Sequence, residues 1–135
     1  MKYLLDTHIL IWALSDRSYL LPDNILSEIN KRDNEIFYSV ASVWETTIKY
    51  SIKPEQIGVS PDTLVNLCNK ADMKCLPITC EHALNVQTLK RLENAPQHKD
   101  LFDRLLIAQA KYEGMVLITH DSLFAGYNEE CILKI

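Results

Sequence analysis

Short apolar runs alternate with longer segments of helical periodicity along the chain. Lys2 to Leu5 predicts a first strand, and Asp6 and Thr7 form the turn into a short helix that ends near Leu14. Later strands are expected at Glu35 to Val40, Lys74 to Ile78, Met115 to Thr119 and Cys131 to Ile135. Strands that alternate with helices are typical of an α/β fold with a mostly parallel sheet.

Capping residues and periodicity predict the helices between these strands. Ser42 with Glu45 has the spacing of a capping box, which predicts a helix from Ser42 to about Lys53. Asn94 to Lys99 is expected to be a loop. Other helices are expected from Pro22 to Lys31, from Ser60 to Asp72, from Glu81 to Leu92 after the capping residue Thr79, and from Leu101 to Glu113, which Gly114 terminates.

From its length and composition, the whole chain, residues 1–135, is expected to form one compact domain. Of its residues, 47% are hydrophobic and 24% are charged, which excludes a disordered or fibrous protein. The apolar stretch Ile9 to Leu14 is too short to cross a bilayer, and Asp6 interrupts any signal peptide. Four cysteines without a C-x-x-C pair are expected to be reduced thiols of a cytoplasmic protein.

The net charge of −4 argues against a protein that coats nucleic acid through a broad basic face. Carboxylates that hold metal ions are neutralised when the ions bind, however, and two divalent cations would cancel this charge. The net charge therefore leaves an RNA or DNA substrate open.

Acidic residues follow the predicted strands or begin the predicted helices. Asp6 follows the first strand, and Glu45 lies in the first turn of the helix after the second strand. Asp100 and Asp103 begin the helix that ends at Gly114, and Asp121 follows the fourth strand. Ligands of parallel sheets bind beyond the carboxyl ends of the strands. We therefore expect these side chains to converge on one edge of the sheet.

Carboxylates that lie within a few ångströms of each other favour a cation between them. Mg²⁺ and Mn²⁺ prefer oxygen ligands, and the chain has no cysteine or histidine spacing that is typical of zinc. Each acid alone has a simpler interpretation, as a helix cap for Asp6 and Asp100, a capping-box partner for Glu45, or a turn residue for Asp121. Their joint placement favours a metal site.

Four segments of the chain contain these acids together with their neighbours. They are Leu4-Leu5-Asp6-Thr7-His8-Ile9-Leu10-Ile11-Trp12, Ser42-Val43-Trp44-Glu45, His98-Lys99-Asp100-Leu101-Phe102-Asp103-Arg104-Leu105-Leu106-Ile107-Ala108-Gln109-Ala110 and Leu117-Ile118-Thr119-His120-Asp121. Together these segments resemble the PIN domain, and more narrowly the VapC-type ribonuclease toxins of prokaryotic toxin–antitoxin pairs. The resemblance runs in order from residue 1 to about residue 127.

This resemblance implies an α/β/α sandwich around a parallel sheet and cleavage of RNA that depends on Mg²⁺ or Mn²⁺. It also implies a homodimer and an antitoxin protein that inhibits the enzyme. Asp6, Glu45, Asp103 and Asp121 match the acidic quartet of the family, and Asp100 matches an extra acid of this branch. Residue 101 is Leu where the branch often has Pro. Of Asp100 and Asp103, Asp103 is favoured as the direct metal ligand. Asp100 is expected in the outer coordination shell of the metal or facing the substrate.

The hypothesised reaction is in-line attack of water on a phosphodiester, which leaves a 5′-phosphate and a 3′-hydroxyl. Asp6 would hold the principal metal ion with Asp103 and Asp121, and Glu45 would orient a water or help to hold a second ion. The hydroxyls of Thr7 and Thr119 are candidates for fixing the carboxylates.

Other residues near the predicted site have more than one interpretation. Arg104 could contact RNA or form a local salt bridge, and Lys49 and Lys53 could meet phosphates or face solvent. The imidazoles of His8, His98 and His120 are expected to contact substrate or to have no role, because Mg²⁺ prefers oxygen. Trp12, Trp44, Met73, Met115 and the cysteines are expected in the core.

Three other functions remain open at this point. One is a housekeeping PIN-type nuclease, and another is a non-catalytic PIN-like protein that binds RNA or a partner. The third is a phosphatase with an aspartyl nucleophile, but His8 stands where such enzymes carry a second Asp. A phosphoacceptor receiver domain is disfavoured, because it would need a lysine at a strand end near the acids and none is evident in this chain.

Overall fold

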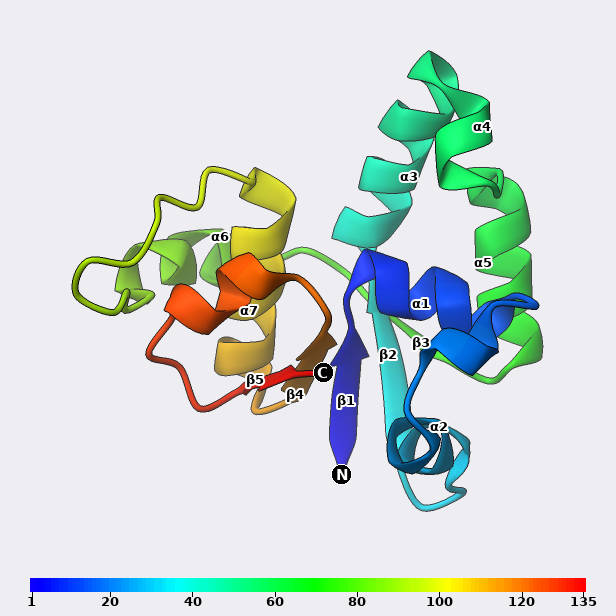
Figure 1. Ribbon diagram of the computed structural model, residues 1–135, viewed down its shortest axis with the longest axis horizontal. Helices are drawn as coiled ribbons and strands as arrows, with labels where there is room; N and C mark the ends of the chain where they lie inside the picture. Colours follow the sequence, from blue (N-terminus) through cyan, green and yellow to red (C-terminus); the bar gives the residue numbers. More distant parts are fainter.

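A central parallel sheet organises the computed structural model, which describes residues 1–135 (Figure 1). Its strands are β1 (Lys2–Leu5), β2 (Glu35–Ser39), β3 (Lys74–Leu76), β4 (Val116–Thr119) and β5 (Ile132–Lys134), all parallel and in the order β3-β2-β1-β4-β5. The strand order reverses direction between β1 and β4, so a crevice for a ligand is expected at the carboxyl ends of these two strands. The predicted α/β fold is confirmed.

Helices connect the strands and cover both faces of the sheet. They are α1 (Thr7–Leu14), α2 (Asp23–Asn30), α3 (Val40–Ile52), α4 (Pro54–Ile57), α5 (Pro61–Lys70), α6 (Cys80–Asn85) and α7 (Leu101–Glu113), with 3₁₀ turns η1 (Ser18–Leu20), η2 (Val86–Thr88) and η3 (Ser122–Gly126). None of these helices combines the length and the apolar character that spanning a bilayer requires.

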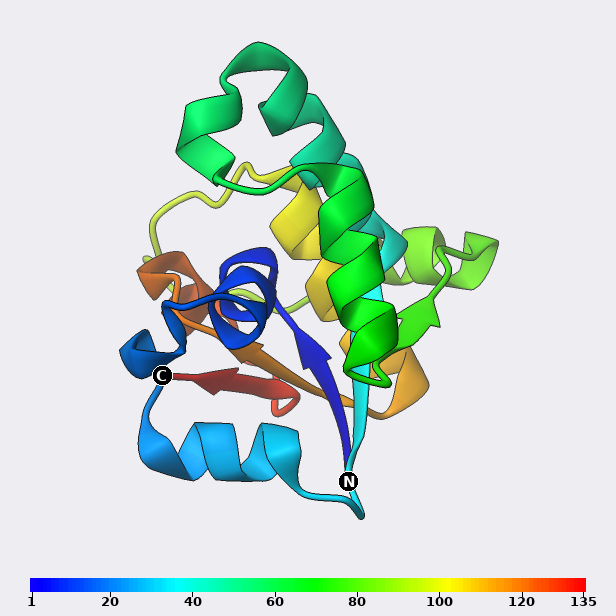
Figure 2. The ribbon, with the colours of Figure 1, turned by 90° about the vertical axis from the view of Figure 1, so that its right-hand side faces the viewer.

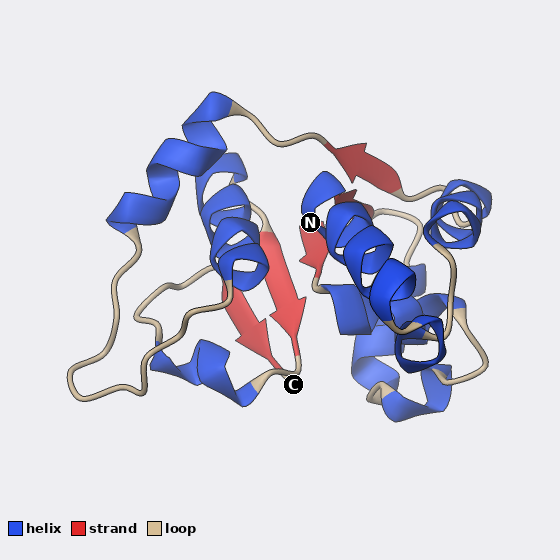
Figure 3. Cartoon of the chain, turned by 90° about the horizontal axis from the view of Figure 1, so that it is seen from above, coloured by secondary structure: helices blue, strands red, loops and turns tan.

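The alternation of side chains along β1 divides the core into two layers. Tyr3 and Leu5 pack into one cluster with residues of α1, α2 and α5, whereas Leu4 packs into the other with residues of α7 and η3. Figures 1 and 2 show α1, α2 and α5 on one side of the strands, and Figure 3 shows the two groups of helices with the strands between them. The molecule is an α/β/α sandwich.

The start of α3 differs from its prediction. The hydroxyl of Ser39, the last residue of β2, accepts a hydrogen bond from the backbone N–H of Ala41 (2.9 Å) and caps the helix. The prediction that Ser42 is the N-cap is therefore wrong, because β2 runs into α3 without a loop. Ser42 is instead fully buried in the first turn of the helix.

Several other expectations are corrected by the fold. No helix is expected between Lys53 and Ser60, but this segment contains the short helix α4. The helix expected from Glu81 to Leu92 ends at Asn85 and is followed by η2. Trp44 is 55% exposed because it faces away from the sheet, so its predicted place in the core is wrong. Cys75 and Cys80 are also exposed, whereas Met73 and Met115 are buried as predicted.

Candidate functional site

Acidic side chains from four parts of the chain meet at the carboxyl ends of β1 and β4. Asp6 directly follows β1, Asp121 follows β4, Glu45 lies in the second turn of α3 and Asp103 lies in the first turn of α7. Asp6, Glu45 and Asp103 are buried, and Asp121 is partly buried. The structure therefore brings together side chains that are separated by more than a hundred positions in the sequence.

Asp6 is held by hydrogen bonds to both of its carboxylate oxygens. The backbone N–H of Thr7 donates to Oδ1 (2.6 Å), so Asp6 also caps α1. The hydroxyl of Thr119, at the end of β4, donates to Oδ2 (2.6 Å). Burial nevertheless raises the pKa of Asp6, since these hydrogen bonds only partly offset the loss of solvation.

Glu45 is fixed by a threonine and a lysine. Thr7 Oγ1 lies 2.7 Å from Glu45 Oε1 and 2.9 Å from the hydroxyl oxygen of Ser42. Because Thr7 has one hydroxyl proton, it donates to the carboxylate and accepts from Ser42. Lys49, one turn later on α3, donates to Glu45 Oε2 at 2.6 Å. Burial lowers the pKa of Lys49, but the hydrogen bond and charge of Glu45 outweigh it and raise this pKa overall.

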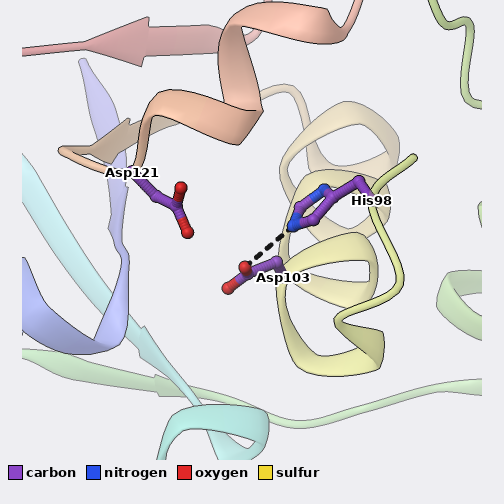
Figure 4. A group of neighbouring side chains, drawn as sticks. All are labelled: His98, Asp103 and Asp121. Atoms are coloured by element: carbon purple, nitrogen blue, oxygen red, sulfur yellow. Dashed lines mark hydrogen bonds and ion pairs between the residues drawn. The ribbon is translucent and has the colours of Figure 1, made fainter. Parts of the chain in front are cut away.

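Asp103 is hydrogen-bonded to a histidine that precedes α7 (Figure 4). His98 Nε2 lies 3.0 Å from Asp103 Oδ2, and His98 Nδ1 lies 2.8 Å from the hydroxyl of Tyr127. Burial lowers the pKa of His98, which favours the neutral ring. A neutral ring satisfies both contacts when Tyr127 donates to Nδ1 and the Nε2 proton is donated to Asp103.

Asp100 and Asp121 occupy more open positions. Asp100 is exposed and caps α7, where its Oδ1 accepts from the N–H of Asp103 (3.1 Å). Asp121 Oδ1 accepts from the N–H of Leu123 (2.9 Å) and so caps η3. Figure 4 shows the carboxylates of Asp103 and Asp121 pointing toward each other. Asp103 thus lies inside the group of acids, and Asp100 lies at its edge.

The charge of this group is poorly compensated. Burial, together with the charges of Asp6, Asp100, Glu45 and Asp121, raises the pKa of Asp103 to about 8. Lys49 is the one lysine or arginine that forms an ion pair with any of these acids. A buried group of carboxylates with this little positive charge favours a bound cation.

The donor atoms fit a hard divalent cation. One ligand atom from each of His98, Asp103 and Asp121 lies within 4.8 Å of the others. The Nε2 atom of His98 already donates to Asp103, so the atoms left for a cation are carboxylate oxygens, which Mg²⁺ and Mn²⁺ prefer. Such an ion supplies activation of water and stabilisation of charge on a phosphate.

Two residues near the acids differ from what the sequence suggested. His98 is only 6% exposed and contacts Asp103 through Nε2, so it is a partner of a candidate ligand, a role that the sequence did not suggest. Its burial depends on contacts with Tyr127 and Phe124, which the local sequence does not reveal. Arg104 forms no ion pair, contrary to one of its two interpretations, and lines a pocket with Arg91, His98 and Tyr127.

Comparisons with known proteins agree with this architecture. The family model described as "PIN domain" matches residues 3–130. A similar chain occurs in a solved structure of VapBC2 from Rickettsia felis, which is bound to a DNA fragment from the VapBC2 promoter. The TM-score is 0.69 at 20% identity, and the match covers 99% of this chain and 98% of that one.

A second similar structure is a domain of a functionally unknown protein from Methanocaldococcus jannaschii. Its TM-score is 0.52 at 16% identity, over 99% of this chain and 90% of that one. No curated protein sequence matches the chain. At these identities the two structures show a shared fold, and the family follows from the match over nearly the whole chain. The chain belongs to the PIN domain family.

Proposed function

We propose that the protein is an endoribonuclease that depends on Mg²⁺ or Mn²⁺. The observation that carries this proposal is that Asp6, Glu45, Asp103 and Asp121 lie near the carboxyl ends of β1 and β4, close enough for the other three charges to raise the pKa of Asp103, with Lys49 as their one ion-pair partner. Membership of the PIN family supports it, because PIN domains are generally nucleases. A phosphodiester carries negative charge, so the acids can accept it only together with a cation.

Each residue of the site has a proposed role. Asp6, Asp103 and Asp121 would hold the cation through carboxylate oxygens, and Glu45 would orient a water molecule or help to hold a second ion. Thr119 fixes one oxygen of Asp6 and Thr7 fixes one oxygen of Glu45 through their hydroxyl groups. Asp100 and Arg104 lie further out, where they would face the RNA.

Cleavage assays with purified protein test this function. We expect single-stranded RNA to be cut in the presence of Mg²⁺ or Mn²⁺, to leave 5′-phosphate and 3′-hydroxyl ends, and to remain intact in EDTA. Cleavage that persists in EDTA would contradict the metal dependence. Hydrolysis of p-nitrophenyl phosphate without RNA cleavage would favour a phosphatase, and cleavage of DNA alone would contradict the assignment to RNA.

We further propose that this nuclease is the cytoplasmic toxin of a toxin–antitoxin pair and forms a homodimer. The similar chain in the VapBC2 structure supports this proposal. Co-purification with the product of the adjacent open reading frame, with loss of cleavage in the complex, is the expected result. A monomer that no neighbouring product binds would favour a housekeeping nuclease.

His98→Ala is expected to weaken Mn²⁺ binding by about 10- to 100-fold, because residues that hydrogen-bond to a metal ligand set its orientation. Tyr127→Phe removes the donor to Nδ1 and should cause a smaller loss in the same direction. His98→Gln retains an N–H group that can reach Asp103, so it should restore part of the affinity. Mn²⁺ titration followed by electron paramagnetic resonance measures all three.

His82→Ala provides a matched control for this experiment. His82 is a buried histidine in the capping box of α6, and none of its hydrogen bonds involves the acidic residues of the candidate site. It should lower the melting temperature without changing Mn²⁺ affinity. Equal Mn²⁺ affinity in folded His98→Ala and wild-type protein would contradict the role of His98 in positioning Asp103.

A further inference from the structure

A pocket with aromatic walls adjoins the acids on the side of α1. Its volume is about 290 Å³, and it is lined by Asp6, His8, Trp12, His120 and Asp121. Two of these residues belong to the proposed cation site, and the other three carry rings. The pocket therefore places flat side chains directly beside the carboxylates.

The rings are held in place by the fold. His8 and Trp12 lie one turn apart on α1, with their ring centroids 6.3 Å apart. The ring of His120, from the end of β4, lies 5.4 Å from Trp12 at an interplanar angle of 61°. His120 Nδ1 contacts the carbonyl oxygen of Ile135 at 3.0 Å, which fixes the imidazole. Trp12 is partly buried and packs against the core.

The chemistry of this pocket suits a nucleobase. Every base has a flat face that stacks on aromatic side chains, and such stacking tolerates any sequence. The carboxylates of Asp6 and Asp121 at the other side of the pocket disfavour a phosphate group in the pocket itself. A nucleotide whose phosphate is held at the acids by a cation would place its base within reach of the rings.

We propose that this pocket is a base-binding subsite, in which the base of the nucleotide next to the cleaved bond stacks on Trp12 between His8 and His120. The inference rests on the proposed ribonuclease function and identifies the base as the part of the substrate that this pocket binds. It gives Trp12 a binding role in addition to its contact with the core. A base of any type enters the subsite, since stacking provides the contact.

A binding assay that does not require cleavage tests this subsite. The chain has two tryptophans, so Trp44→Phe leaves Trp12 as the one tryptophan reporter in the pocket. Trp44 lies on α3 outside the pocket, with its ring edge-to-face against Phe102 (5.1 Å between ring centroids), so phenylalanine keeps an aromatic ring at this contact. The probes are octaadenylate and the same ribose-phosphate octamer without bases, each with Ca²⁺ in place of Mg²⁺.

We expect octaadenylate to change the fluorescence of Trp12 and to bind about 5- to 150-fold more tightly than the octamer without bases. His8→Ala and Trp12→Leu, made in wild-type protein and followed by the polarisation of labelled probes, should each reduce this ratio. His8 is exposed, so His8→Ala keeps the test valid if Trp12→Leu does not fold.

Equal binding of the two probes, or an unchanged Trp12 signal, would overturn the subsite even if RNA is cleaved. A response of Trp12 to a partner protein but not to octaadenylate would assign the pocket to that partner and overturn the proposal. Binding that depends on bases without cleavage under any metal would instead contradict the nuclease function and support the pocket as a base site.

Discussion

Asp6→Asn is expected to lower the rate of RNA cleavage by about 1,000-fold or more, which corresponds to about 4 kcal/mol in the activation free energy. Asp6 is buried at the carboxyl end of β1, and its charge would hold the cation that stabilises the reacting phosphate. Single-turnover rates at saturating Mg²⁺ measure the loss directly.

The fold should tolerate this substitution. The Oδ1 atom of Asn can still accept from the N–H of Thr7, and the hydroxyl of Thr119 can accept from the new amide. Removal of one charge also relieves the repulsion on Asp103. Asp62→Asn, at an exposed acid in the first turn of α5, is the matched control and should cleave at the wild-type rate. Residual activity of Asp6→Asn within tenfold of wild type would contradict the proposed role.

The metal-free protein is expected to lose stability as the pH rises toward about 8. The Asp103 carboxyl releases its proton near pH 4 in the unfolded chain but near pH 8 in the folded one. Between these values the folded state binds more protons than the unfolded state. The free energy of unfolding therefore falls with increasing pH, by at most about 1.4 kcal/mol per pH unit for this group. Burial raises the pKa of Asp6 as well, which acts in the same direction.

Asp103→Asn should remove the part of this dependence that Asp103 contributes, because an amide does not ionise and its oxygen can accept from His98. Relative to wild type, we expect the variant to gain about 2 to 4 kcal/mol between pH 5 and pH 8. Urea denaturation in EDTA at several pH values measures the difference, and added Mg²⁺ should restore the stability of wild type alone. Parallel pH profiles for the two proteins would contradict the raised pKa of Asp103.

The position of the acids at strand ends could be predicted from local sequence alone. Leu4 and Leu5 form a buried strand, so Asp6 necessarily stands at its carboxyl end, and the same holds for Asp121 after β4. The parallel sheet then brings these ends together. The sandwich fold follows from the same alternation, because successive residues of β1 face opposite layers of helices.

Details that depend on contacts between distant segments could not be predicted. The contact of His98 with Tyr127 joins residues 29 positions apart, and no local pattern indicates it. The absence of a loop between β2 and α3 moves the helix cap from Ser42 to Ser39. Trp44 is apolar and follows the helical pattern, but it is exposed on α3, where its ring meets the ring of Phe102 edge-to-face.

Calorimetric titration of the metal-free protein with Mn²⁺ tests most directly whether the buried carboxylates form a cation site. We expect saturable binding with release of protons, since the elevated pKa of Asp103 leaves a proton that the cation displaces. We also expect Asp6→Asn and Asp103→Asn to weaken this binding strongly, and Asp62→Asn to leave it unchanged. Binding that is absent, or that is equal in wild type and all three variants, would show that these carboxylates do not form a cation site.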